Sequence, residues 1–342
     1  MPNANGHIAL IATGGTISQG PEGALGAASL IRLAASTRRL PADVPIRGTD
    51  LASSPSSEAT VDSIHALAAC AAQRVADPGC FGVVVTHGTD AMEEVSLACE
   101  LLLGKINKPV VFTGAMIPPK HRGTDAHQNL VDALRAAHTS SGLRGLCVAM
   151  TGRLHMPLEV RKANTSARDA FVSPPLGPFG LITDAGVELV REPVRLGLVS
   201  PRLEGEVELV RLTAGGGPRL LQAAIELGAR GIVLELFGAG NVGQDVCRSV
   251  ARATERGVAV LACSRVGLGE LTPGSGVLAA GAIPATLPGT GQTLGGLSAR
   301  IVLMAALGAG LDRDRISRLF GPANEDEHED QDGDQDDPRP GG

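Results

Sequence analysis

Short apolar runs rich in β-branched residues alternate with longer stretches of helical periodicity along most of this chain. The runs over 7–13, 81–86, 109–115 and 143–151 each have the pattern of a buried strand. Strands that alternate with helices are typical of a parallel sheet whose two faces are both covered. We therefore expect a doubly wound, mostly parallel α/β sheet in a larger N-terminal domain.

Helical periodicity is clearest between residues 61 and 102. Apolar residues recur at intervals of three and four over 61–75 and again over 92–102, so each segment presents one apolar face to a sheet. A further helix is expected over 129–137, between the third and fourth strands. Helices in these positions provide the crossover connections that parallel strands need.

Prolines interrupt this alternation over 173–206, where five of them stand among scattered charges. Such a stretch is typical of a connection between domains. Beyond it the alternation resumes, which predicts a smaller C-terminal α/β domain. The expected strands are 207–213, 231–237 and 258–263, and the expected helices are 219–227, 245–256 and 298–308.

The resulting domain plan has an N-terminal domain over 1–190, a linker over 191–206, a C-terminal domain over 207–322 and an acidic tail over 323–342. The tail contains nine of the 36 acidic residues and little apolar surface to offset ordering entropy, so it is expected to be disordered. The formal net charge of the whole chain is −6, and the tail, with nine acidic residues and one arginine, accounts for all of this negative charge. The rest of the chain is therefore nearly neutral. We expect no nucleic-acid or membrane partner.

Cysteine and histidine spacing indicates a protein without disulfides, metal or other cofactors. The six cysteines include no CxxC pair, so we interpret them as reduced core thiols, and the histidines show no HExxH or HxH spacing. The first strand begins at His7 without a basic leader or a cleavage site, and no window of about 20 residues is apolar enough to span a bilayer. The expected location is cytoplasmic.

The sequence TGGTIS, residues 13–18, directly follows the first expected strand. Gly14 and Gly15 permit a tight turn and a close approach of the backbone to a ligand. Thr16 would present its hydroxyl at the carboxyl edge of the sheet, where open α/β folds bind substrates. The alternative is a plain turn after a strand, because Gly-Gly-Thr alone is a weak motif.

The sequence THGTDAMEE, residues 86–94, follows the second expected strand in the same way. With Asp90 as N-cap and Glu93 at the third helical position, it is close to a capping box, which is a purely structural alternative. A cap does not account for the hydrogen-bonding residues just before it, which lie beside a helix N-terminus whose dipole favours a substrate carboxylate. Among these, His87 is expected to be a structural hydrogen-bonding residue rather than a general base.

Two weaker candidates complete the set. The third strand ends in Gly114 and Ala115, whose backbone N–H groups are available to line the same crevice or to stabilise an oxyanion. Lys162, in the sequence VRKANT, has a functional meaning only if it lies near Thr89 and Asp90. A lone lysine is otherwise a solvated surface residue.

Taken together, these motifs resemble those of the bacterial-type L-asparaginases and glutaminase-asparaginases, a family of amidohydrolases. The resemblance covers nearly everything except the tail, and two threonine motifs in this order and spacing are highly specific. The matching stretches are ATGGTIS at 12–18, SSEAT at 56–60, VVVTHGTDAMEE at 83–94, KPVVFTGAM at 108–116, GTDAHQNL at 123–130 and RKANTS at 161–166, with weaker likeness at 231–242 and 298–307.

The resemblance implies that the chain hydrolyses L-asparagine to L-aspartate and ammonia, without a cofactor, as a homodimer or homotetramer. Thr16 would attack the side-chain carbonyl and carry the acyl group, while Thr89, Asp90 and Lys162 would handle protons. A threonine hydroxyl needs such help because it is a poor nucleophile at neutral pH. The implied substrate contacts are Gly15, Ser56, Ser57, Gly88, Thr89, Asp90 and Ala115, with the Asp90 carboxylate meeting the α-amino group.

Two departures from the family bear on turnover and on substrate choice. Most relatives carry a lid tyrosine that orients the first threonine, but this chain has no tyrosine, and the corresponding stretch 19–35 offers only mobile glycines. Another donor must substitute, or turnover must fall. In the C-terminal domain, which in the family completes the neighbouring active site, Asn241 is retained and Glu270 is a candidate for the acidic residue. The choice between asparagine and glutamine stays open.

Other functions are compatible with parts of the sequence. GAGNVG at 238–243 fits a dinucleotide-binding G-x-G-x-x-G motif, but Arg265 stands where the ribose-binding acid is expected, and the pattern arises easily in a chain with 45 glycines. A catalytically weak relative that binds an amino acid as a sensor is compatible with the missing tyrosine. The relative that releases ammonia for tRNA amidation usually carries an additional N-terminal domain, whereas the first motif here lies within the first 18 residues.

Overall fold

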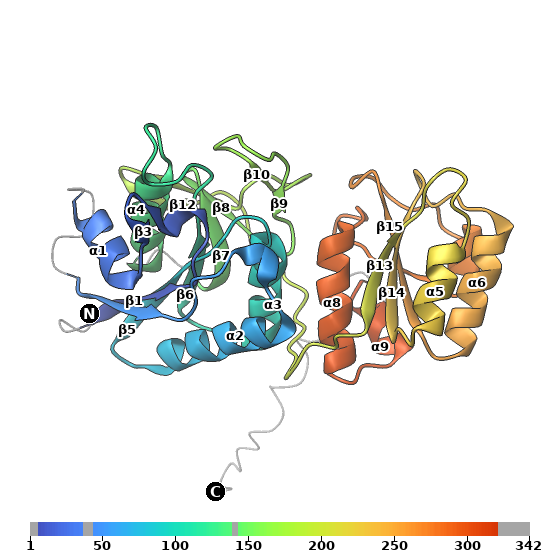
Figure 1. Cartoon of the computed structure of the whole chain (residues 1–342). Helices are drawn as coiled ribbons and strands as arrows, with labels where there is room; N and C mark the ends of the chain where they lie inside the picture. The colour runs from blue at the N-terminus through green and yellow to red at the C-terminus, as the bar shows by residue number, and fades with distance from the viewer. Residues whose placement is uncertain (1–5, 37–43, 139–142, 321–342) are drawn as a thin grey trace, which may run out of the picture.

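The computed structural model describes residues 6–36, 44–138 and 143–320 in two domains that lie side by side (Figure 1). The predicted fold class is confirmed, because a larger, mostly parallel α/β domain precedes a smaller one with its own sheet. The acidic tail predicted to be disordered lies outside the described residues.

The N-terminal domain is built on an eight-stranded sheet of order β12-β11-β8-β7-β6-β5-β1-β4. The five strands from β7 to β4 are parallel and the other three are antiparallel. The antiparallel strands are not among the predicted elements, because runs of three or four residues are too short to show an alternation. The strands are β1 His7–Ala12, β4 Ile46–Asp50, β5 Cys80–Thr86, β6 Pro109–Thr113, β7 Gly145–Met150, β8 Arg153–His155, β11 Gly180–Thr183 and β12 Gly186–Leu189.

Helices cover both faces of this sheet, as the alternation of strands and helices predicts. The helices α1 (Ala27–Ala35) and α4 (Ala126–His138) pack on one face, and α2 (Val61–Ala76) and α3 (Met92–Leu103) pack on the other. Successive residues of the central strands point to opposite faces. In β1, Leu10 belongs to the apolar cluster beneath α1 and α4, and Ile11 belongs to the cluster beneath α2 and α3. The sheet is therefore buried on both sides.

The strand order creates a crevice at one edge of the sheet. β1 lies between β4 and β5, so the chain leaves β1 toward one side and later returns to its other side. Ligands of open α/β sheets bind outside the carboxyl ends of the strands at such a switch point. The two threonine motifs follow β1 and β5 and therefore flank this crevice.

The C-terminal domain has a parallel sheet of order β13-β14-β15-β16, with α8 on the face toward the N-terminal domain (Figure 1). α8 packs against α3, so one apolar core extends across both domains. A separate apolar cluster fills the other face of the sheet, beneath α5, α6 and α7. The elements are β13 Val207–Arg211, α5 Arg219–Glu226, β14 Gly231–Leu236, α6 Gln244–Glu255, β15 Ala259–Ser264, α7 Gly276–Ala279, β16 Ile283–Pro284, α8 Gly296–Gly308 and α9 Arg313–Arg318.

Short elements lie in the loops at the carboxyl edge of the large sheet, where they shape the crevice. They are the 3₁₀ turns η1 Thr16–Ser18 and η2 Ser56–Glu58, the hairpin β2 Gln19–Gly20 with β3 Gly23–Ala24, and the pair β9 Arg161–Lys162 with β10 Phe171–Val172.

All six cysteines are free thiols, as predicted from their spacing. Four are buried in the core, and Cys70 and Cys247 are half-buried. Burial raises the pKa of the Cys99 and Cys147 thiols to about 12, so these side chains are protonated and unreactive at neutral pH. Within the described ranges, no helix is both long and apolar enough to cross a membrane.

Candidate active site

The first motif turns sharply at the end of β1. Gly14 and Gly15 have φ angles of 95° and 82°, a region that favours glycine, and the chain then enters η1 with Thr16 as its first residue. A Cβ atom on Gly15 would lie only 2.4 Å from the Gly88 Cα atom. The glycine therefore lets the first motif contact the second directly.

Gly88 makes a similar close contact with a third loop. A Cβ atom on Gly88 would lie 2.5 Å from the hydroxyl oxygen of Ser56, which follows β4. The Ser56 hydroxyl in turn accepts a hydrogen bond of 3.3 Å from the backbone N–H of Ala91. Loops from three adjacent strands thus pack against one another at the switch point.

A cavity of about 320 Å³ opens between these loops. Six of the residues that the resemblance implies line it: Gly15, Thr16, Ser56, Gly88, Thr89 and Asp90. Ser57, which is exposed on η2, and Ala115, which is fully buried, do not line it. The predicted set is therefore brought together except at these two positions.

Lys162 joins the set from a distant part of the chain. Its Nζ atom lies 2.9 Å from the Thr89 hydroxyl oxygen and 2.6 Å from the Asp90 Oδ1 atom. The Lys162 side chain is only 15% exposed, whereas that of Asp90 is 70% exposed. The condition for a functional Lys162, proximity to both residues, is met in this structure.

The capping box that stood as the structural alternative at the second motif does not form. The N-cap of α3 is Ala91, and no side chain caps it. The Asp90 carboxylate instead accepts from Lys162 Nζ, and the Glu93 Oε2 atom accepts a hydrogen bond of 2.9 Å from the Lys162 backbone N–H. Both carboxylates turn toward Lys162 because its ammonium and amide donors lie beside the helix start.

The two threonines differ in their hydrogen bonding. Thr89 is buried and its hydroxyl is bonded to Lys162. Thr16 is half-buried on the cavity wall, and its hydroxyl forms no hydrogen bond within the described part of the chain. One hydroxyl is therefore connected to a lysine, while the other is available to a ligand.

The hairpin formed by β2 and β3, in the stretch where the resemblance implies a tyrosine-bearing lid, lines part of the cavity. It is closed by a hydrogen bond of 2.7 Å from the Leu25 N–H to the Ser18 carbonyl oxygen. Gln19 of this hairpin is among the residues that line the cavity. No phenol is available here, because the chain contains no tyrosine.

Lys120 also lines the cavity, which the sequence motifs do not predict. It lies in the loop after β6, and the turn before it is held by Asp125, whose carboxylate accepts from the backbone N–H groups of Met116 and Ile117 at 2.9 and 2.8 Å. Asn129 donates a hydrogen bond of 3.0 Å to the Gly114 carbonyl oxygen. The motif GTDAHQNL at 123–130 therefore supports the loop that carries Lys120. In the sequence, Lys120 is distinguished only by its position between two stretches that match the family.

His87 has a structural role, as expected. Its Nδ1 atom donates a hydrogen bond of 2.8 Å to the Gly88 carbonyl oxygen, which orients the loop that carries Thr89. Burial lowers the pKa of the His87 imidazole, so the neutral form predominates at neutral pH.

The C-terminal candidates lie apart from the cavity. Asn241 and Glu270 are both exposed, and neither lines it. The glycine-rich loop that contains Asn241 is held by a hydrogen bond of 2.8 Å from the Thr272 N–H to the Ala239 carbonyl oxygen. Across the described ranges, no group of three or more His, Cys, Asp or Glu side chains is arranged to hold a metal ion.

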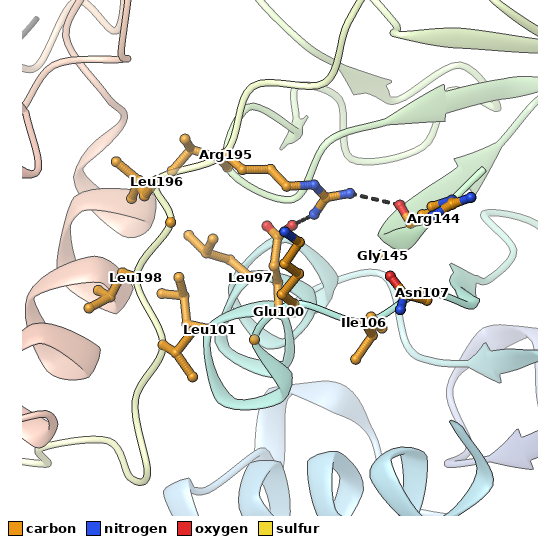
Figure 2. Close-up of a pocket in the computed structure, with 15 residues that line it drawn as sticks. Leu97, Glu100, Leu101, Ile106, Asn107, Arg144, Gly145, Arg195, Leu196 and Leu198 are labelled. Carbon is orange, nitrogen blue, oxygen red and sulfur yellow. Dashed lines mark hydrogen bonds and ion pairs between the residues drawn. The ribbon is translucent and has the colours of Figure 1, made fainter. Parts of the chain in front are cut away.

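A second cavity, of about 390 Å³, lies at the other end of α3 (Figure 2). Most of its lining is apolar, with Leu97 and Leu101 among the residues, and Glu100 and Arg195, which form an ion pair, also line it. Arg195 also donates a hydrogen bond of 3.1 Å to the Arg144 carbonyl oxygen. None of the predicted site residues lines this cavity, so its chemistry differs from that of the crevice.

Family models match almost the whole described chain. Residues 7–195 match the model described as Asparaginase, N-terminal, and residues 206–320 match the model described as Glutaminase/Asparaginase C-terminal domain. This chain belongs to the asparaginase family. Membership of this family supports an amidohydrolase activity, which agrees with hydroxyl, carboxylate and ammonium groups around one polar cavity.

Curated relatives differ in what their names say they act on. A glutamyl-tRNA(Gln) amidotransferase component of Pyrococcus horikoshii is 33% identical, over 70% of this chain and 57% of its own length. L-asparaginase 2 of Escherichia coli is 31% identical, over 70% of this chain and 70% of its own length. The matched part thus spans only 50 to 57% of the first amidotransferase components that it resembles.

A solved structure, described as a probable cytoplasmic L-asparaginase from Campylobacter jejuni, has the same fold. It matches with a TM-score of 0.80 at 28% identity, over 92% of this chain and 99% of that chain. The similarity therefore extends over both domains of this asparaginase-family protein.

Proposed function

We propose that this protein is an L-asparaginase that hydrolyses L-asparagine to L-aspartate and ammonia through a threonine acyl-enzyme. One observation carries the proposal: Lys162 Nζ contacts both the Thr89 hydroxyl and the Asp90 carboxylate, at 2.9 and 2.6 Å, beside a cavity that Thr16 also lines. When a hydroxyl is the nucleophile in covalent amide hydrolysis, neighbouring groups must accept and return its proton.

In the first half-reaction, the Thr16 oxygen forms a bond to the side-chain carbonyl carbon of asparagine. The hydroxyl proton passes to the set formed by Thr89, Asp90 and Lys162. The tetrahedral intermediate collapses when a proton reaches its nitrogen, the carbon–nitrogen bond breaks, and ammonia leaves. Thr16 is the preferred nucleophile because its hydroxyl forms no hydrogen bond within the described residues, whereas that of Thr89 is bonded to Lys162.

In the second half-reaction, water attacks the acyl carbon. The water loses one proton to the same set, the carbon–oxygen bond to Thr16 breaks, and the threonine oxygen is protonated again. L-Aspartate is then released and the starting state is restored. Because the set accepts and returns protons within each half-reaction, no further reagent is needed.

The cavity suits a small zwitterionic amide. The exposed Asp90 carboxylate is available to the substrate α-amino group, and the Lys120 ammonium supplies a positive charge for the α-carboxylate. Ser56 and the backbone at Gly15 and Gly88 offer further polar contacts. Ser57 and Ala115 do not line the cavity, so we assign them no direct contact.

Asparagine is the preferred substrate because relatives from E. coli and Bacillus subtilis, and the solved C. jejuni structure, are named L-asparaginases. Glutamine hydrolysis is the first alternative, since other relatives act on glutamyl-tRNA(Gln) by name. A catalytically weak amino-acid sensor is the second, since the hairpin over the cavity lacks a tyrosine. We also predict a homodimer or homotetramer with a cytoplasmic location. In such an oligomer, the exposed residues Asn241 and Glu270 are available to contact a neighbouring copy.

The test is ammonia release from L-asparagine, L-glutamine and D-asparagine by the wild type beside Thr16→Ala and Thr89→Val. Circular dichroism establishes that the three proteins are equally folded. We expect release from L-asparagine by the wild type and a loss of at least about 100-fold in both variants. A wild type that binds asparagine by calorimetry but releases no ammonia would contradict the proposal and favour the sensor.

A further inference from the structure

Lys162 shares the short strand β9 with Arg161, and their side chains reach different domains. Lys162 Nζ contacts the second motif, whereas the Arg161 guanidinium donates a hydrogen bond of 2.6 Å to the Gly267 carbonyl oxygen. Gly267 follows β15 in the C-terminal domain, and β9 lies on the side of the N-terminal domain that faces it (Figure 1). β9 therefore connects the candidate active site to the neighbouring domain.

Glu93 holds the backbone of the same strand. Its Oε2 atom accepts a hydrogen bond of 2.9 Å from the Lys162 N–H. Glu93 lies in the first turn of α3, the helix that begins directly after Thr89 and Asp90. Lys162 is thus attached to one stretch of chain at both ends, through its backbone to Glu93 and through its Nζ atom to the motif.

Glu93 is half-buried among charged groups, and the charge of Glu94 adds to the effect of burial on the pKa of its carboxyl group. Burial raises the pKa of the Glu93 carboxyl group, while the Lys162 N–H and the charge of Arg161 lower it. On its other side, Arg161 packs against Gly295, where a Cβ atom would lie 3.2 Å from the Arg161 Nε atom, and the charge of Glu235 in β14 raises the pKa of Arg161 against the effect of burial. Arg161 is therefore influenced by the charge of a carboxylate from each domain, and it forms a hydrogen bond to the C-terminal domain at Gly267.

We propose that Glu93 and Arg161 are positioning residues for Lys162. Glu93 fixes the backbone of Lys162 to the start of α3, and Arg161 fixes the same strand to the C-terminal domain. The Lys162 ammonium is thereby kept within hydrogen-bond distance of Thr89. The kinetic part of this inference rests on the proposed function, because it assigns Lys162 a place in amide hydrolysis.

The kinetic test compares Glu93→Leu and Glu93→Gln with Glu94→Leu. Glu94 is the matched control, because it lies on the same helix turn and burial also raises the pKa of its carboxyl group, but the charge that faces it is that of Arg300. We expect Glu93→Leu to lower kcat by about 10- to 100-fold with little change in KM, as misplacement of a catalytic group does. Glu93→Gln retains an oxygen acceptor and is expected to keep at least about a third of kcat, and Glu94→Leu is expected to match the wild type.

A second measurement does not depend on activity. Acetylation of individual lysines is followed by mass spectrometry, with the exposed Lys105 and Lys120 as internal references. We expect Lys162 to react slowly in the wild type and in Glu93→Gln, and several-fold faster in Glu93→Leu. If the wild type releases no ammonia but this pattern appears, the proposed function fails and the positioning role stands. Unchanged Lys162 labelling in Glu93→Leu overturns the inference.

Arg161→Met tests the link to the C-terminal domain, with Arg211→Met as its control. Arg211, in β13, forms an ion pair with Glu235 and is 62% exposed. We expect Arg161→Met to lower kcat and to accelerate Lys162 acetylation as Glu93→Leu does, and Arg211→Met to change neither. Equal effects of the two arginine variants would show that only the charge near Glu235 matters and would overturn the role of Arg161.

Discussion

Lys162 and Thr89 are joined by a hydrogen bond of 2.9 Å although 73 residues separate them in the chain. The strand β9 carries the lysine and the loop after β5 carries the threonine, and the lysine also forms an ion pair with Asp90 at 2.6 Å. The Thr89 hydroxyl is therefore the link between a largely buried ammonium and the cavity.

Lys162→Met should abolish most of the turnover without unfolding the protein. We expect kcat to fall by about 100- to 10,000-fold, since general acid–base groups contribute factors of this size. The melting temperature should change little, because Asp90 is 70% exposed and stays solvated when its partner is lost. Ammonia release and thermal unfolding check both statements, and a Lys162→Met enzyme within about 10-fold of the wild type would remove Lys162 from the mechanism.

Gly15→Ala should damage the site through its backbone. The new Cβ atom would lie 2.4 Å from the Gly88 Cα atom, and the residue has a φ angle of 82°. We expect kcat/KM to fall at least about 10-fold and the free energy of unfolding to fall by about 1 to 3 kcal/mol, the usual cost of backbone strain. Urea titration and ammonia release measure the two effects.

The control for this substitution is Gly205→Ala. Nothing lies within 4 Å of the Cβ position at Gly205, and its φ angle is not in the left-handed region. In this control, kcat/KM and the free energy of unfolding should both stay within error of the wild type. Full activity in Gly15→Ala would mean that the two threonine loops can separate without cost.

Lys120→Ala should weaken substrate binding more than catalysis. Lys120 lines the cavity but is not joined to Thr89 or Asp90, so we assign it to the substrate carboxylate. We expect KM for L-asparagine to rise by about 3- to 10-fold, as loss of one exposed charged contact does, with kcat within about 2-fold of the wild type. Lys105→Ala is the control, because Lys105 is equally exposed but lines the cavity at the other end of α3. A fall in kcat instead would assign Lys120 to the chemistry.

His155 should make the protein sensitive to acid. Burial, with the nearby charges of Arg153 and Arg191, lowers the pKa of His155 from 6.5 to about 4. Between pH 4 and pH 6.5, His155 is therefore mostly protonated in the unfolded chain and mostly neutral in the folded protein. Stability contributed by neutral His155 is complete above pH 6.5 and is lost as the pH falls toward 4.

We expect the free energy of unfolding to fall by about 2 to 3 kcal/mol from this group between about pH 7.5 and pH 4.5. Urea titrations at the two pH values measure this decrease in the free energy of unfolding. In His155→Gln, the decrease should be smaller by the contribution of His155. His121→Gln is the control, since His121 is exposed. If His155→Gln and the wild type lose the same stability, another group is responsible for the acid sensitivity.

Local sequence pattern anticipated the long strands and helices well. The alternation of apolar runs predicted β1, β5, β6, β7 and the C-terminal strands, because a strand buried on both faces needs a continuous apolar run. It did not reveal the antiparallel strands β8, β11 and β12, because runs of three or four residues are too short to show an alternation. At Asp90 and Glu93, the local pattern was also compatible with a capping box, but both carboxylates accept hydrogen bonds from Lys162 instead.

The sequence by itself determined the fold class, the family and the two threonine motifs, because these depend on periodicity and on residues close together in the chain. Only the tertiary structure decided that Lys162 meets Thr89 and Asp90, that Lys120 enters the cavity, and that Ser57 and Ala115 stay outside it. These contacts join loops from separate strands. Their geometry follows from the strand order and from the close approach of backbone at Gly15 and Gly88, which no local pattern encodes.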